Sequence, residues 1–188
     1  WVANLASLEL HTTLSQATSY DSPDLLLFDI DPEPPLTFDD VIDVALLVRE
    51  HLENAGITSL VKTSGKKGVH IVVPLSAGHR FEVVRAFAHA VGKTIARDSS
   101  HVVAEFARSR DKGTIFIDYL QNSAWKTMIA PYSLRATGTA TVSAPVSWDD
   151  LSRGIDPGDF TLQTFRAEDA DPWMDLYTST QRLPEVGK

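Results

Sequence analysis

The 188-residue chain is 43% hydrophobic, contains no cysteine and carries a formal net charge of −8 at pH 7. This length and composition support one hydrophobic core, in one domain or in two tightly joined lobes. The lack of cysteine excludes disulfides and cysteine-ligated zinc, and no run approaches the roughly 20 apolar residues of a membrane span. Because no signal-peptide pattern opens the sequence, we expect a cytoplasmic location and no membrane partner.

Strands and helices alternate along the first part of the chain. We expect strands at residues 5–14 and 24–31, the second apolar on both faces, as in a central strand that is covered on both sides. Thr37, with Asp40 three residues later, predicts a capped helix N-terminus for a helix over residues 37–54.

The middle of the chain predicts two strands and a second helix. The strands are expected near residues 57–62 and 69–75, with a glycine-containing turn between them. Residues 80–97 carry apolar side chains at i, i+3 and i+4 spacing, which is typical of an amphipathic helix.

The last predicted elements are shorter. We expect a short helix near residues 101–108 and strands at residues 114–120 and 139–146, followed by short helices that prolines separate. The pattern predicts an α/β (α+β) fold, with the core of the domain at residues 1–151. Residues 152–188 are expected to form a C-terminal helical extension of the same domain.

Three aspartates predict a metal site. Asp29 and Asp31 lie on the same face of their strand, because side chains alternate along a strand. Asp118 interrupts an apolar run, where an ionised carboxylate is costly to bury unless it is paired or ligates a metal. Two divalent cations bridged by carboxylates activate the attacking oxygen and neutralise the leaving oxygen in phosphoryl or nucleotidyl transfer. We therefore predict that these three aspartates are catalytic metal ligands.

The segment SGKKGVH, at residues 64–70, predicts a phosphate-binding turn. Its glycines allow a tight backbone, Ser64 and His70 offer short-range donors, and Lys66 and Lys67 offer positive charge. The alternative for the lysines is a solvated turn, and for His70 a hydrogen-bonded core histidine. Together with the acidic strand, the segment predicts a site for a nucleoside triphosphate and its metals.

The order of these motifs resembles the archaeo-eukaryotic primase superfamily, in which a DxD strand, SGxxGxH and a strand ending in Asp follow one another. Longer matches resemble the polymerase domain of bacterial and archaeal ATP-dependent DNA ligase D of non-homologous end joining. The matching segments are FDIDP (28–32), KTSG (62–65), HIVVPL (70–75), IDYLQN (117–122) and APYSLRA (130–136). The resemblance implies a primase-like fold with an RRM-like mixed or antiparallel sheet flanked by helices.

The resemblance also implies which residues hold the triphosphate. For Arg135 a purely structural salt bridge is the alternative, and for His11, in the segment ELH, a structural role is equally open. Trp125 and Lys126 depart from the family, which places a glycine near this point. The residues expected to bind nucleotide are Ser64, Lys66, Lys67, His70, Arg135, Gln121 and His11.

By resemblance, the reaction is the addition of a ribo- or deoxyribonucleotide to a primer 3′-hydroxyl at a DNA end or gap, with two Mn²⁺ or Mg²⁺ ions. The expected partners are DNA ends, a nucleoside triphosphate, a DNA ligase and a Ku-like end-binding protein, at the nucleoid.

The net charge of −8 is unusual for a protein that binds a polyanion. The chain also begins with Trp1 rather than Met, and the related polymerase domains carry an upstream segment with much of the DNA-end contact. We therefore expect an absent upstream segment and weak extension of DNA ends by this chain alone. The alternative function is a truncated, catalytically weak module that binds nucleotide or DNA ends.

Two other enzyme classes also use Asp-x-Asp. Haloacid-dehalogenase phosphatases place Thr or Val two residues after the second Asp, where this chain has Glu33. Glycosyltransferases hold a metal and a nucleotide sugar with the same motif, but have no need for SGxxGxH.

Overall fold

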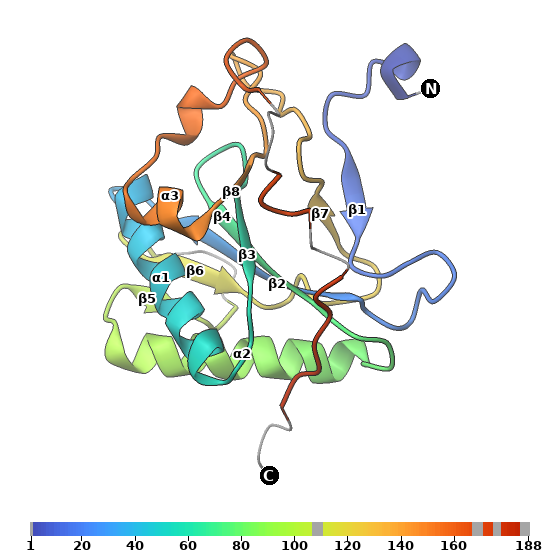
Figure 1. Cartoon of the computed structure of the whole chain (residues 1–188). Helices are drawn as coiled ribbons and strands as arrows, with labels where there is room; N and C mark the ends of the chain where they lie inside the picture. The colour runs from blue at the N-terminus through green and yellow to red at the C-terminus, as the bar shows by residue number, and fades with distance from the viewer. Residues whose placement is uncertain (1, 107–110, 167–170, 175–177, 185–188) are drawn as a thin grey trace.

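The computed structural model describes residues 2–106, 111–166, 171–174 and 178–184. Regular elements alternate along the chain in the order shown in Figure 1. They are η1 (Val2–Leu5), β1 (His11–Thr13), β2 (Leu25–Pro32), α1 (Phe38–Asn54), β3 (Leu60–Thr63), β4 (Val69–Pro74), α2 (Phe81–Asp98), β5 (Val102–Val103), β6 (Ile115–Asp118), β7 (Thr127–Ile129), β8 (Pro145–Val146), α3 (Trp148–Ser152) and η2 (Pro157–Asp159).

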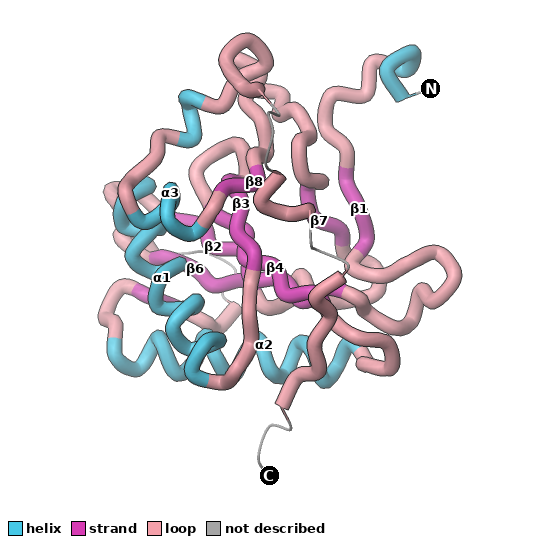
Figure 2. The backbone as a smooth tube through the Cα atoms, viewed as in Figure 1, coloured by secondary structure: helices cyan, strands magenta, loops and turns pink. Residues whose placement is uncertain are grey.

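A six-stranded mixed sheet forms the centre of the structure, with strand order β5-β6-β2-β4-β3-β8. All neighbouring strands in it are antiparallel except β5 and β6. The segment β2-α1-β3-β4-α2-β6 is a β-α-β-β-α-β unit in which β2 and β4 lie side by side in the middle. Figure 2 shows β1 and β7 as a separate antiparallel pair beside this sheet. The predicted mixed α/β fold is confirmed.

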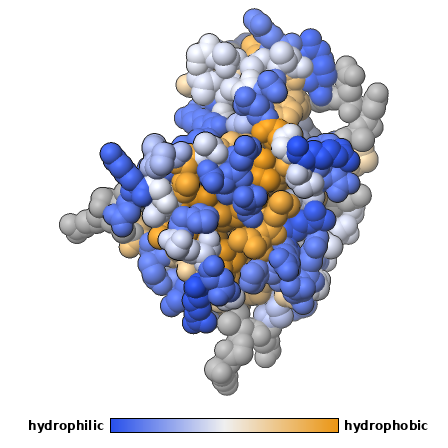
Figure 3. Space-filling view, turned by 90° about the vertical axis from the view of Figure 1, so that its left-hand side faces the viewer, coloured by the Kyte–Doolittle hydropathy of each residue, from blue (hydrophilic) through white to orange (hydrophobic). Residues whose placement is uncertain are grey.

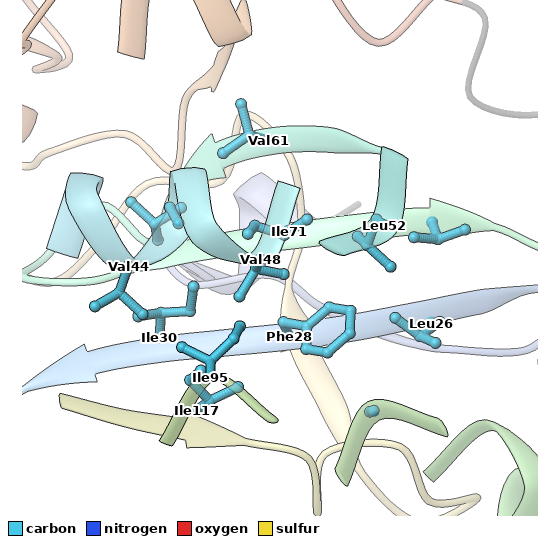
Figure 4. Packing of buried hydrophobic residues seen from close by; sticks show 14 of the residues in the cluster. Leu26, Phe28, Ile30, Val44, Val48, Leu52, Val61, Ile71, Ile95 and Ile117 are labelled. Carbon is cyan, nitrogen blue, oxygen red and sulfur yellow. The ribbon is translucent and has the colours of Figure 1, made fainter. Parts of the chain in front are cut away.

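Both long helices pack on one face of the sheet, as the close view in Figure 4 shows for α1. Every second residue of β2 and β4 enters this core, because side chains alternate between the two faces. The residues that meet there include Leu26, Phe28, Ile30, Ile71, Val44, Val48, Leu52, Ile95 and Ile117.

The opposite face of the sheet is divided into two parts. At the start of β2, Leu25 and Leu27 join a smaller apolar cluster that also contains Met128 and Trp173. The Trp173 indole N–H donates a hydrogen bond of 3.0 Å to the Val61 carbonyl and so fixes this cluster to the sheet. Further along β2, the same face carries polar side chains instead.

The predicted helix N-terminus at Thr37 is confirmed. The Asp40 carboxylate accepts the Thr37 backbone N–H at 2.7 Å, and this hydrogen bond lowers the pKa of Asp40. Helix α1 then runs from Phe38 to Asn54, close to the predicted range.

Several local features differ from the expectation. The helix expected near residues 101–108 is replaced by Val102–Val103, which pairs with β6, and residues 107 and 108 lie outside the described part. Two β-branched residues beside an open strand edge favour sheet over helix. The strand expected at residues 5–14 is regular only at His11–Thr13. Strand β7, Thr127–Ile129, was not expected.

The later part of the chain packs back on the core. The expected strand at residues 139–146 is regular only at Pro145–Val146, but isolated bridges join Thr141 to Thr161 and Leu75 to Gln181. The division of the chain at residue 151 remains a prediction.

Figure 3 shows hydrophobic surface between polar side chains on the side where α1 and α3 lie in Figure 1. Within the described ranges, no helix has both the length and the hydrophobicity needed to cross a membrane.

Candidate active site

A row of four polar residues crosses the sheet on the face opposite the helices. The register pairs Asp29 with His70 on one side and with Asp118 on the other. It also pairs His70 with Lys62 on β3. Because directly paired residues point to the same face, the four side chains project together, with Asp31 two residues further along β2.

His70 is buried and held against Asp29. Its Nε2 lies 3.2 Å from Asp29 Oδ1, and burial lowers the pKa of the imidazole. The other ring nitrogen, Nδ1, is buried without a hydrogen-bond partner among the described residues. An unsatisfied buried nitrogen of this kind costs the fold stability. His70 is thus a core histidine and a lining residue of the site at the same time.

The two glycines of the SGKKG turn let it approach its neighbours closely. Gly68 lies against Asp31, since a Cβ at Gly68 would come within 2.6 Å of Asp31 Oδ1. Gly65 adopts φ +73°, and a Cβ there would meet Arg135 Cγ at 2.6 Å. The turn therefore touches the acidic strand on one side and the arginine on the other, which larger residues would prevent.

Ser64 shapes the turn through its hydroxyl group. Ser64 Oγ accepts the backbone N–H groups of Gly68 at 3.1 Å and Lys66 at 3.3 Å. The Ser64 N–H donates to the Gly68 carbonyl at 2.9 Å. The two bonds to Oγ use the acceptor capacity of the hydroxyl, so its own hydrogen is available for a ligand oxygen.

The three cations of the predicted site have different neighbours. Lys67 Nζ donates to the Pro32 carbonyl at 2.8 Å, while its side chain stays 53% exposed. Lys66 Nζ lies 3.5 Å from Glu9 Oε1. Arg135 donates through Nη1 to the Ser64 carbonyl at 3.0 Å and through Nε to Glu9 at 3.2 Å. The salt bridge considered for Arg135 is therefore present, within the site.

These residues enclose a pocket of about 480 Å³. It brings together the acidic strand, the SGKKG turn and the arginine segment, which are far apart in the sequence. Three predicted residues, Asp118, Gln121 and His11, are not among the described residues that line it. The lining residues are Asp29, Asp31, Ser64, Lys66, Lys67, His70, Arg135 and Thr137.

Asp118 and Gln121 lie together beside the pocket. Asp118 accepts the Leu120 N–H at 2.8 Å and the Gln121 side-chain amide at 3.3 Å. Among the residues that the structure describes, no three acidic or histidine side chains form a ready-made metal cage. The carboxylates of Asp29, Asp31 and Asp118 fit a hard divalent cation by their oxygen chemistry.

Sequence reasoning missed the role of Lys62, although the residue stands inside the KTSG segment. Lys62 is fully buried, and burial lowers its pKa to about 7. Its ammonium group donates to the Ser143 hydroxyl and, at 3.4 Å, to the Thr63 carbonyl. Lys62 thus places a buried amine, which changes its charge near neutral pH, at the end of the polar row.

A sheet of this topology, with paired carboxylates facing a glycine-rich turn, defines a primase-like class of protein. The family model "LigD, primase-polymerase domain" matches residues 1–173. The chain belongs to this family, whose members are DNA-directed nucleotidyltransferases.

Individual relatives agree with this assignment. The multifunctional non-homologous end joining protein LigD of Pseudomonas aeruginosa is 31% identical over 185 residues, which are 95% of this chain and 22% of that protein. The bifunctional LigD protein of Bacillus subtilis is 30% identical over 190 residues, with 98% and 31% covered. The chain thus spans about a fifth to a third of these relatives.

A solved structure has the same fold. The polymerase domain of Mycobacterium tuberculosis ligase D, in complex with DNA, is 32% identical, with a TM-score of 0.73. The match covers 84% of this chain and 57% of that chain.

Proposed function

We propose that this chain adds nucleotides to a primer 3′-hydroxyl at DNA ends or gaps during non-homologous end joining. The observation that carries the proposal is the contact between two motifs: Gly68 of the turn lies against Asp31 of the acidic strand. A triphosphate bound by the turn would therefore place its phosphates beside the carboxylates.

Asp29, Asp31 and Asp118 would hold two divalent ions, Mn²⁺ or Mg²⁺. When bound, such ions activate the attacking hydroxyl and neutralise the leaving pyrophosphate. The structure suits this arrangement because Asp29 and Asp118 are directly paired on neighbouring strands.

The chain's own residues bind and orient the triphosphate. Arg135, Lys66 and Lys67 neutralise its negative charge, while the Ser64 hydroxyl donates to a phosphate oxygen. His70 lines the pocket beside the proposed triphosphate position and holds Asp29 in place through its 3.2 Å contact. Gln121 orients Asp118, and His11 acts from the rim of the pocket. These roles stabilise charge that develops in the transition state.

The partners follow from the relatives. Both curated relatives have non-homologous end joining in their names, and the solved relative is a complex with DNA. We include in the proposal a DNA ligase and a Ku-like end-binding protein as partners at the nucleoid in the cytoplasm.

The test is primer extension by the 188-residue chain on a recessed DNA end, with Mn²⁺ and labelled nucleotide. Asp29→Asn keeps the size of the side chain but removes its charge, so extension should fall by at least about a hundredfold. Asp43→Asn, an exposed carboxylate on α1, is the matched control and should retain activity.

Circular dichroism would show that both variants remain folded. Near-normal extension by folded Asp29→Asn protein would end the metal hypothesis. Nucleotide binding without any extension by the unaltered chain would favour the alternative, a module that binds nucleotide or DNA ends only.

A further inference from the structure

Glu9 is the acidic centre of the cation cluster beside the pocket. Its Oε1 accepts the Ala136 backbone N–H at 2.9 Å and Arg135 Nε at 3.2 Å, and Lys66 Nζ lies 3.5 Å away. Its Oε2 lies 3.7 Å from His11 Nε2. One carboxylate therefore joins residues from three separate segments of the chain.

This carboxylate is anchored to the backbone. The hydrogen bond from Ala136 is the main cause that lowers the pKa of Glu9 to about 2, and Arg135 and Lys66 contribute in the same direction. Glu9 is thus ionised at neutral pH. The Ala136 N–H thus adds a backbone donor to the two cationic side chains that hold Glu9.

Arg135 is held on two sides as a result. Glu9 accepts from its Nε, the Ser64 carbonyl accepts from its Nη1, and its stem lies across Gly65. The Arg135 side chain is only 13% exposed, yet it lines the pocket. A long side chain fixed at two donors loses little further freedom when it binds a phosphate.

We propose that Glu9 is a positioning residue that holds Arg135 and Lys66 in place for the triphosphate without touching it. This inference rests on the proposed function, because it assigns the triphosphate to the same pocket. We call such a residue a clamp, because it holds the groups that bind the ligand. Glu9 is not among the described residues that line the pocket, as expected for a clamp and not for a direct ligand.

The opposite role, in which Glu9 occupies the phosphate position and competes with nucleotide, makes the contrary prediction. Removing a competitor strengthens nucleotide binding, whereas removing a clamp weakens it. The backbone anchor at Ala136 and the place of Glu9 outside the lining favour the clamp.

The test uses Glu9→Gln, which keeps an acceptor oxygen but removes the charge, and Glu9→Ala, which removes both. Nucleotide binding is measured by calorimetry with Mn²⁺ and a non-hydrolysable triphosphate, and extension kinetics are measured in parallel. Glu9→Gln should weaken binding and raise KM for nucleotide roughly tenfold, the effect of losing a charged hydrogen bond, and Glu9→Ala should do so further. The kcat should change less than about threefold, since the metal ligands are untouched.

Glu50→Gln is the matched control: it removes the same charge from an exposed residue of α1 and should leave nucleotide binding unchanged. In an Arg135→Ala background, Glu9→Gln should weaken nucleotide binding much less than it does in the unaltered chain, because the two residues act as a unit. The clamp would be overturned if the losses of nucleotide affinity from Glu9→Gln and Arg135→Ala were fully additive. Tighter nucleotide binding by Glu9→Gln would also overturn it.

The two proposals fail in different ways. If the chain binds nucleotide but never extends primers, the polymerase function fails, while weaker binding by Glu9→Gln still supports the clamp. If extension is normal and Glu9→Gln lowers only the melting temperature, the clamp fails and the function stands. A chain that binds no nucleotide contradicts both.

Discussion

Gly68 lies directly against the carboxylate of Asp31. A Cβ at Gly68 would come within 2.6 Å of Asp31 Oδ1 and closer still to the Ile30 carbonyl, so this position has room only for glycine. The glycine of one motif thereby sets the distance between the phosphate turn and the acidic strand.

Gly68→Ala should therefore impair the site. The added methyl group pushes the turn away from β2, which should destabilise the fold by about 1–3 kcal/mol and reduce primer extension. Urea unfolding and extension assays measure the two effects. Gly138→Ala is the matched control, because a Cβ at Gly138 meets nothing within 4 Å. Equal behaviour of the two variants would contradict the close packing.

Lys67→Ala should weaken nucleotide binding roughly tenfold, because the half-exposed ammonium group is a phosphate ligand in the proposed site. Affinity for DNA alone should stay nearly unchanged, which fluorescence anisotropy measures. Lys93→Ala, on α2, is the control and should affect neither.

Two results would change this assignment of Lys67. Equal losses of DNA and nucleotide affinity would assign the turn to the nucleic acid. Lower stability with normal nucleotide binding would leave Lys67 a structural role, through its hydrogen bond to the Pro32 carbonyl and its 3.8 Å contact with Glu33.

Lys62 should make stability depend on pH. Its pKa is lowered from 10.5 to about 7 in the folded chain, so between these values the unfolded chain binds more protons. Raising the pH through this window therefore stabilises the fold. Between pH 7.5 and 9.5, the free energy of unfolding should rise by about 2 kcal/mol more in the unaltered chain than in Lys62→Met.

Urea unfolding at both pH values checks the prediction for Lys62. Lys126→Met, an exposed lysine, should keep the pH dependence of the unaltered chain. The same pH dependence in Lys62→Met would show that the folded chain keeps Lys62 charged throughout this range.

DNA binding by this chain should be weak and only slightly dependent on salt. The net charge of −8 leaves few cations to neutralise DNA phosphates, and the slope of log affinity against log salt counts the phosphates contacted. We expect a slope of magnitude about 2–3 for a recessed DNA end, measured by anisotropy at several KCl concentrations. Tight binding with a steep slope would place a complete DNA-binding surface within these 188 residues.

Much of the site could be predicted from local patterns. Alternation along a strand was enough to put Asp29 and Asp31 on one face, and the pair Thr37 and Asp40 was enough to start α1. The SGKKG segment indicated a tight turn because glycine alone tolerates such backbone and such contacts. Each of these inferences depends on residues within a few positions of one another.

The remaining features of the site depend on how strands that are distant in sequence pair with one another. The row from Lys62 through His70 and Asp29 to Asp118 exists because four strands pair in one alignment, which no single strand specifies. Val102 and Val103 became a strand because β6 offered an edge to them.

The contact of Glu9 with Arg135 likewise could not be predicted from local sequence. It lies 126 residues from Arg135 in sequence, yet the two are in contact. Local sequence determined which chemical groups this protein carries and on which face of each element they lie. Only the tertiary structure decided which of them meet, because burial and strand pairing act between segments whose separation in sequence leaves no local pattern.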